Sequence, residues 1–180
     1  MHARVLLLLV IIVLSIGSVS AQDAPAPHVI PDQIMNAELK PLRGNKPIKL
    51  SDYRDKNVLV LAMWATWCGP CVLSMPELNK IRKDFSSRGV EVVGLSNVRD
   101  ERNASAVRHY VRTQRLKFRF VWISEEISSA LNTRKLLPVT LVVTSDGVIS
   151  KEFLGWNPIE TTPRLRAAIE ETLARTDARQ

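Results

Sequence analysis

The chain has 180 residues, of which 46% are hydrophobic and 24% are charged, and this suits one domain with a substantial core. Its formal net charge is +7, but the basic residues are scattered in short pairs such as Arg82 with Lys83 and Arg134 with Lys135. No long basic arm is present, which argues against a nucleic-acid-binding protein. We interpret the excess charge as a solvated basic surface, with some bias toward acidic partners or membranes.

The first 21 residues are typical of a secretory leader. Arg4 provides a positive start, an apolar run begins at Val5, and Val19-Ser20-Ala21 offers small residues for cleavage. The apolar run is shorter than the roughly 20 residues of a membrane-spanning helix. We therefore expect residues 1–21 to be a signal peptide, with an uncleaved membrane anchor as the alternative. Export places the chain in the periplasm or another oxidising, extracytoplasmic compartment.

Residues 22–32 contain Pro25, Pro27 and Pro31, and they are predicted to be an extended linker before a domain that spans 33–176. The domain is expected to open with a hairpin between Leu39 and Leu50, which turns at Arg43-Gly44-Asn45.

Strand and helix signals alternate through the rest of the chain. The run 58–63 is apolar throughout, as in a strand that is buried on both faces. Further strands are predicted at 90–95, 118–123, 139–144 and 148–153. Apolar residues at helical spacing predict a helix from the first strand to Gly89, two shorter helices around 104–111 and 127–131, and a closing helix around 165–173. This order predicts an α/β fold with a largely parallel central sheet and an antiparallel hairpin at its edge.

The only two cysteines stand in Trp67-Cys68-Gly69-Pro70-Cys71, between the first long strand and the helix that follows it. Pro70 fits the first turn of that helix, so Cys68 is expected at the helix N-terminus. Unpaired N–H groups and the positive end of the helix dipole favour a thiolate there, and the thiolate is the attacking species. Cys71 lies one turn deeper and is predicted to be the buried resolving thiol. A purely structural disulfide is the weaker interpretation, because cross-linking so small a loop stabilises little.

A metal site is the competing interpretation of the cysteine pair. Two cysteines supply half of a tetrahedral zinc set, and the sequence contains no second C-x-x-C motif. Of the histidines, His2 lies in the leader, His28 in the linker and His109 on a predicted helix. We expect no metal and no cofactor, and a metal-binding or chaperone module that uses the same cysteines remains as a non-enzymatic alternative.

The segment from Val58 to Cys71 resembles the thioredoxin superfamily, and it is most similar to the exported TlpA/ResA-like thiol-disulfide oxidoreductases. Pro76 lies where that family kinks the helix, and Leu137-Pro138-Val139-Thr140 resembles its cis-proline loop. The segment 97–136 matches the family's central strand-helix insert. The resemblance implies a thioredoxin-like fold, a central mixed sheet flanked by helices, with an N-terminal hairpin and this insert.

The resemblance also implies roles for individual residues. A redox-active disulfide would join Cys68 to Cys71, with Trp67, Gly69 and Pro70 in the active-site loop. Leu137–Pro138 would be cis, pack against the cysteine pair and leave the Leu137 backbone free to bind a client peptide. Among the tryptophans, Trp67 would be an exposed wall beside Cys68, Trp64 a core residue, and Trp122 and Trp156 packing residues.

Two positions depart from the family pattern. A buried acid late in the preceding strand is replaced by Ala62, and a glutamate after the second cysteine is replaced by Ser74. Both acids are associated with the proton of the resolving thiol, so Cys71 must lose its proton to water or to another group. Glu77 is interpreted as a surface helix residue.

These features predict an exported protein-disulfide reductase. It would take electrons from a membrane donor and reduce protein disulfides, for which apocytochrome c is one candidate client. The Gly69-Pro70 pair favours the reducing end of the known potentials. A disulfide oxidase or isomerase is the enzymatic alternative. Contact with a membrane is expected only if the leader is uncleaved.

Overall fold

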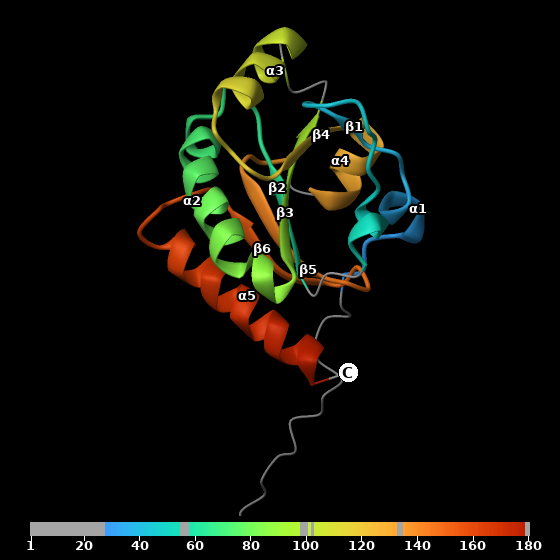
Figure 1. The fold of residues 1–180 in the computed structure, drawn as a ribbon, viewed down its shortest axis with the longest axis vertical. Helices are drawn as coiled ribbons and strands as arrows, with labels where there is room; N and C mark the ends of the chain where they lie inside the picture. The colour runs from blue at the N-terminus through green and yellow to red at the C-terminus, as the bar shows by residue number, and fades with distance from the viewer. Residues whose placement is uncertain (1–27, 55–57, 98–100, 102, 133–134, 179–180) are drawn as a thin grey trace, which may run out of the picture.

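Six strands form one mixed sheet in the computed structural model, which describes residues 28–54, 58–97, 101, 103–132 and 135–178. The order across the sheet is β1-β4-β3-β2-β5-β6 (Figure 1). β2 runs parallel to β3 and β3 to β4, whereas β1, β5 and β6 are antiparallel to their neighbours. The bounds are β1 (Lys40–Pro41), β2 (Val58–Met63), β3 (Val90–Asn97), β4 (Arg119–Ile123), β5 (Val139–Thr144) and β6 (Ile149–Leu154).

Helices cover both faces of this sheet (Figure 1). They are α1 (Asp32–Met35), α2 (Gly69–Phe85), α3 (Ala104–Thr113), α4 (Glu125–Leu131) and α5 (Thr161–Asp177), with 3-10 turns η2 (Leu50–Tyr53) and η3 (Ser86–Arg88). The predicted α/β fold of thioredoxin type is therefore confirmed, including the closing hairpin β5–β6. None of the helices in the described ranges is both long and apolar enough to cross a bilayer.

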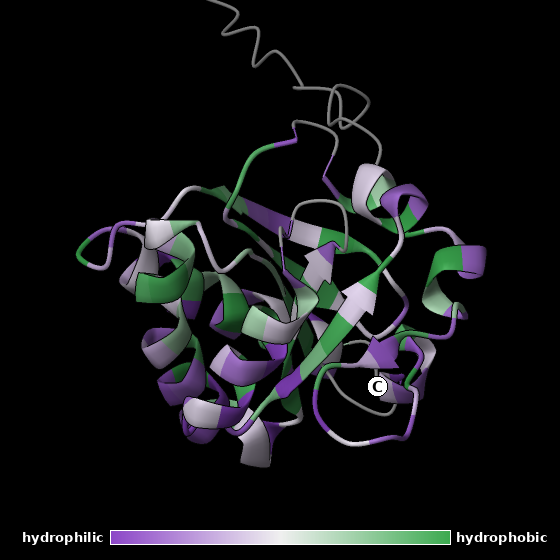
Figure 2. Ribbon diagram, turned by 90° about the horizontal axis from the view of Figure 1, so that it is seen from above, coloured by the Kyte–Doolittle hydropathy of each residue, from purple (hydrophilic) through white to green (hydrophobic). Residues whose placement is uncertain are grey.

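Alternating side chains of the central strands build two separate cores. In β2, Val58, Val60 and Ala62 face the core that contains α2, α3 and α5. The intervening Leu59, Leu61 and Met63 face the core that contains α1 and α4. Figure 2 shows hydrophobic residues along these central strands and hydrophilic residues on the outer sides of the helices. All six residues of β2 are buried, as the unbroken apolar run predicts for a strand covered on both faces.

The predicted hairpin between Leu39 and Leu50 is present only as a single antiparallel bridge, which joins Leu39 to Ile48. β1, which begins at the next residue, instead pairs with β4 and forms one edge of the six-stranded sheet. Pro41 explains the difference, because Leu39 and Ile48 exchange both backbone bonds and residue 41 would have to donate the next N–H of the hairpin ladder.

The predicted leader and residues 22–27 of the predicted linker lie outside the described residues. The end of that linker is attached to the domain, since Val29 bridges to Val148 and Ile30 donates its N–H to the Gly147 carbonyl at 2.9 Å. Ile30 is only 2% exposed. The folded part therefore begins a few residues before the boundary predicted at residue 33.

Gly94 on β3 is a position where the packing excludes any side chain. A Cβ atom added there would lie 2.6 and 2.8 Å from two ring carbons of Phe120. We expect Gly94→Ala to lower the free energy of unfolding by about 1–3 kcal/mol, the usual cost of overpacking. Urea unfolding of the oxidised protein measures this. Gly69→Ala is the matched control, because its methyl would meet nothing within 4 Å. Equal midpoints for Gly94→Ala and wild type would contradict the prediction.

Candidate functional site

The two cysteines form a disulfide where β2 passes into α2. Their Cα atoms lie 5.2 Å apart, so the predicted pairing of Cys68 with Cys71 is present. Cys68 is the N-cap of α2, and its sulfur accepts the Cys71 N–H at 3.3 Å. Pro70 stands in the first turn, where a missing N–H breaks no helical bond. The predicted placement of Cys68 at the helix N-terminus is confirmed.

The two sulfurs differ in their access to solvent. Cys68 is 5% exposed and Cys71 is fully buried at 0%. The flanking Gly69 and Pro70 are exposed, and so is Trp67, at 59%. An incoming thiolate or disulfide must therefore react at Cys68, because access decides which sulfur is attacked. Cys71 can attack only the Cys68 sulfur, after Cys68 has formed a mixed disulfide.

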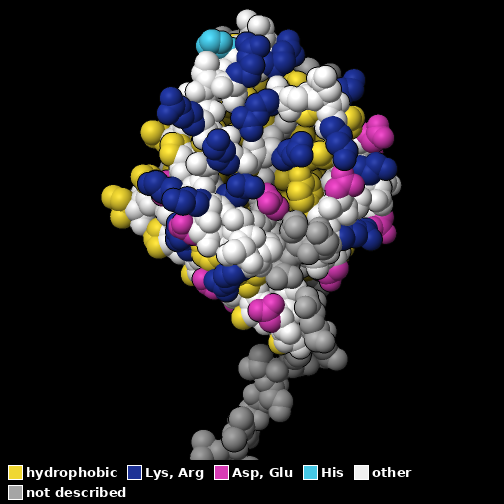
Figure 3. Space-filling model, viewed as in Figure 1, with side chains coloured by type: hydrophobic (Ala, Val, Ile, Leu, Met, Phe, Trp, Pro, Cys, Tyr) yellow, Lys and Arg dark blue, Asp and Glu magenta, His cyan; other side chains and the backbone are white. Residues whose placement is uncertain are grey.

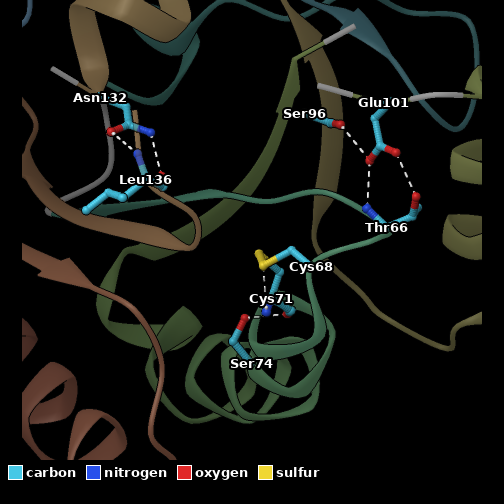
Figure 4. Close-up of a disulfide and its surroundings, with 8 residues drawn as sticks. All are labelled: Thr66, Cys68, Cys71, Ser74, Ser96, Glu101, Asn132 and Leu136. Carbon is cyan, nitrogen blue, oxygen red and sulfur yellow. Dashed lines mark hydrogen bonds between the residues drawn. A yellow bond between two sulfur atoms is a disulfide. The ribbon is translucent and has the colours of Figure 1, made fainter. Parts of the chain in front are cut away.

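A tight turn delivers Cys68 to the helix. The Cys68 N–H donates to the Ala65 carbonyl at 3.2 Å, and the Trp64 N–H donates to the Leu95 carbonyl of β3 at 3.0 Å. Between them, Thr66 donates its backbone N–H (2.7 Å) and its hydroxyl (2.6 Å) to the two oxygens of Glu101 (Figure 4). The sequence analysis missed Glu101. Its only signal was an acidic residue between a strand end and a helix start, which Asp100 shares.

The loop before β5 lies at the same edge of the sheet. Leu137–Pro138 is cis, as the resemblance implied, and Val139 pairs with Met63, the last residue of β2. The buried Asn132, also missed from the sequence, holds the loop. Its amide donates to the Leu136 carbonyl at 2.6 Å and accepts the Leu136 N–H at 3.3 Å (Figure 4).

A cleft of about 320 Å³ opens beside Trp67, between the turn that holds this residue and the loop before β5. Trp67 forms part of one wall and Leu137 part of the other. Its remaining lining residues are mostly polar, and the full set is Trp67, Asn97, Glu125, Ser128, Ser129, Asn132, Lys135, Leu136 and Leu137. Glu125 accepts a hydrogen bond from the Asn97 amide at 2.7 Å. The cleft has room for a side chain next to Trp67, the residue before Cys68, and Trp67 and Leu136 offer it exposed apolar surface.

The described residues beside Cys71 include no obvious proton acceptor. Ala62 is apolar, and the Ser74 hydroxyl donates to the Cys71 carbonyl at 2.7 Å. Glu77 pairs with Lys80 at 2.7 Å. Tyr110 packs 5.3 Å from Trp64, and burial raises the pKa of its phenol, which is therefore neutral at pH 7. The departure from the family pattern at Ala62 and Ser74 is thus not compensated by these neighbours.

The other tryptophans and the basic residues lie as the sequence analysis expected. Trp64 is 1% exposed, and Trp122 and Trp156 pack against the core formed with α2, α3 and α5. Figure 3 shows Lys and Arg side chains spread over one face rather than gathered in a single groove. Within the described ranges, no group of three or more His, Cys, Asp or Glu side chains is arranged to hold a metal ion.

Comparisons with known proteins agree with the family resemblance found in the sequence. A family model described as Redoxin matches residues 22–169. Thioredoxin-like protein YneN of Bacillus subtilis is 32% identical over 123 residues, which is 68% of this chain and 70% of that protein. Thiol-disulfide oxidoreductase ResA of Bacillus thuringiensis is 32% identical over 116 residues, which is 63% of each chain. The match therefore spans less than two thirds of the length of ResA.

Among solved structures, a secreted disulfide oxidoreductase of Mycobacterium tuberculosis, described as homologous to E. coli DsbE, has a similar fold. The TM-score is 0.63 and the identity 17%, over 78% of this chain and 98% of that one.

Proposed function

Because the chain belongs to the Redoxin family and is a homologue of ResA-type thiol-disulfide oxidoreductases, we propose that it is an exported protein-disulfide reductase. The observation that carries this proposal is the contrast between the two sulfurs. Cys68 caps a helix and retains some exposure, whereas Cys71 is buried directly behind it. That arrangement suits one attacking and one resolving thiol.

The proposed cycle begins with the dithiol form. The Cys68 thiolate attacks a client disulfide, forms a mixed disulfide and releases one client thiolate, which takes up a proton. Cys71 loses its proton and attacks the Cys68 sulfur. This step releases the second client thiol and leaves the Cys68–Cys71 disulfide that the structure contains. The client gains two electrons and two protons, and a donor dithiol must return the same number to the protein.

The direction of electron flow is supported by the Gly69-Pro70 pair, which is typical of reducing sites. The predicted leader supports export to the periplasm or an equivalent compartment, where a membrane protein would act as donor. In this proposal the clients are protein disulfides, which suits the cleft beside Trp67. Cytochrome c maturation is one use of such a reductase.

Two measurements test the proposal. The mature protein, starting at Gln22, should accelerate the reduction of insulin by dithiothreitol, relative to a variant with both cysteines changed to serine. Its reduction potential against glutathione should lie nearer to about −270 mV than to about −120 mV. No acceleration would refute the activity. A potential near the upper value would instead favour a disulfide oxidase or isomerase.

Trp67 should contribute to client binding more than to chemistry. Trp67 is 59% exposed and lines the cleft, so a bound peptide can bury it. We expect Trp67→Ala to raise the KM for a protein disulfide about tenfold, as for a moderate interface hot spot. The rate with oxidised glutathione should change little. Val29→Ala is the matched control, because Val29 is 48% exposed but pairs with Val148 at the opposite end of the sheet. An unchanged KM for Trp67→Ala would exclude this role.

A further inference from the structure

We infer that Glu101 is a positioning residue for Cys68, because its buried carboxylate holds the turn that places the sulfur at the start of α2. The inference rests on the proposed thiol chemistry of Cys68. It does not depend on the direction of electron flow or on the client.

The contacts of Glu101 converge on a single residue of this turn. One carboxylate oxygen accepts the Thr66 N–H at 2.7 Å, and the other accepts the Thr66 hydroxyl at 2.6 Å. The Ser96 hydroxyl of β3 is a weaker third donor at 3.4 Å. Glu101 is only 9% exposed, so little water competes for these bonds. Short bonds from two donors of one residue to a carboxylate are among the stronger hydrogen bonds in proteins.

The position of Thr66 explains why this contact reaches the sulfur. The bond from the Cys68 N–H to the Ala65 carbonyl closes a four-residue turn, in which Thr66 and Trp67 are the central residues. The N–H of the first central residue has no partner inside such a turn, so it needs an external acceptor. Glu101 supplies that acceptor from a segment 35 residues away. Figure 4 shows its carboxylate turned toward Thr66, with Cys68 and Cys71 beyond the turn.

The orientation of Cys68 depends on this turn. The sulfur is stabilised as a thiolate only if it stays over the unpaired N–H groups at the start of α2. In the disulfide form it accepts the Cys71 N–H at 3.3 Å. If the turn loosens, the sulfur samples positions away from these donors, and both its thiolate fraction and its rate of attack fall. Glu101 thus acts on Cys68 through Thr66, without touching the reacting atoms.

Four single variants separate this role from a merely structural one. Glu101→Ala removes both acceptor oxygens. Glu101→Gln keeps a carbonyl for the Thr66 N–H and an amide that can donate to the Thr66 oxygen, so it should rescue the geometry. Thr66→Val removes only the hydroxyl donor. Ser96→Ala removes only the 3.4 Å contact and serves as the matched control.

The readouts are the rate constant for reaction of the dithiol protein with oxidised glutathione at one pH, and the equilibrium constant of the same exchange. We expect Glu101→Ala to lower the rate constant about tenfold. A change of this size corresponds to part of the free energy that a charge-assisted hydrogen bond contributes. Its equilibrium constant should shift toward the protein disulfide, because the thiolate is less stabilised. Glu101→Gln and Ser96→Ala should stay within about threefold of wild type, and Thr66→Val should be intermediate.

Two outcomes would overturn the inference. The first is a folded Glu101→Ala protein with wild-type rate and equilibrium constants. Glu101 would then contribute only to the stability of the fold and not to the reactivity of Cys68. The second is a Glu101→Gln protein as slow as Glu101→Ala, which would assign the effect to charge rather than position. If Glu101→Ala does not fold, Glu101→Asp replaces it under the same expectations, because its shorter side chain cannot reach both donors. If the wild-type protein fails to reduce insulin but the variants still show these differences with glutathione, the proposed function is refuted and the inference about Glu101 stands.

Discussion

Replacing Cys68 with serine is expected to reduce the rate of insulin reduction to that of dithiothreitol alone. The serine hydroxyl is a far weaker nucleophile at neutral pH, and Cys71, at 0% exposure, cannot reach a protein disulfide in its place. We expect a loss of about 10³-fold or more in the catalysed rate, equivalent to roughly 4 kcal/mol in the activation free energy.

The loss in Cys68→Ser should be chemical rather than structural. Serine is a favourable N-cap residue, and its oxygen can accept the Cys71 N–H that the sulfur accepts now. Near-ultraviolet circular dichroism should therefore match that of the reduced wild type, whereas Cys68→Ala also loses the cap. Substantial activity in Cys68→Ser would mean that Cys71 becomes accessible, and the proposed assignment of the two thiols would be wrong.

Replacing Cys71 with serine is expected to stop the cycle after its first half. Cys68 keeps its place at the helix start and still attacks a client disulfide, but no thiol is available to release the client. The mixed disulfide should then accumulate, approaching one client chain per protein molecule. Non-reducing electrophoresis and intact-mass measurement, without dithiothreitol, detect the adduct.

The adduct should disappear on addition of dithiothreitol, and it should be absent when Cys68 is also replaced. Because position 71 is fully buried, a serine there must bury a hydroxyl, and Cys71→Ala provides a second variant without that cost. If neither variant forms an adduct while Cys68 still reacts with iodoacetamide, Cys68 is not the group that attacks the client.

Much of the fold could be predicted because the signals are local and repeated. The predicted strands at 58–63 and 139–144 have the bounds of β2 and β5, because six-residue runs rich in apolar and β-branched residues are typical of a strand covered on both faces and short for a helix. The helix predicted around 104–111 is present as α3, and Asn103 caps its first turn by accepting the Ser105 N–H at 2.9 Å. The hairpin near Leu39 was predicted from its turn residues alone. The hairpin ends after one bridge because Pro41 has no N–H to donate to its next hydrogen-bonded pair.

The supporting residues of the site could not be predicted in this way. Glu101 lies in a short run of charged residues, and nothing in the sequence distinguishes it from neighbours that are expected to be solvated. Asn132 likewise resembles an ordinary residue at the end of a short helix, although it closes the loop that leads to Pro138. Each acquires its role from a backbone group whose hydrogen bond the surrounding fold leaves unmade.

By itself, the sequence determined the chemistry of this protein: two thiols separated by two residues, a proline in the first helical turn, and a strand that leads into them. These features act within a few residues of one another, through backbone geometry and the helix terminus. Only the tertiary structure decided which carboxylate holds the turn in front of Cys68, and which residues line the cleft beside Trp67. Burial and the pairing of backbone groups depend on segments far apart in the chain, and their positions are set when the layers pack together.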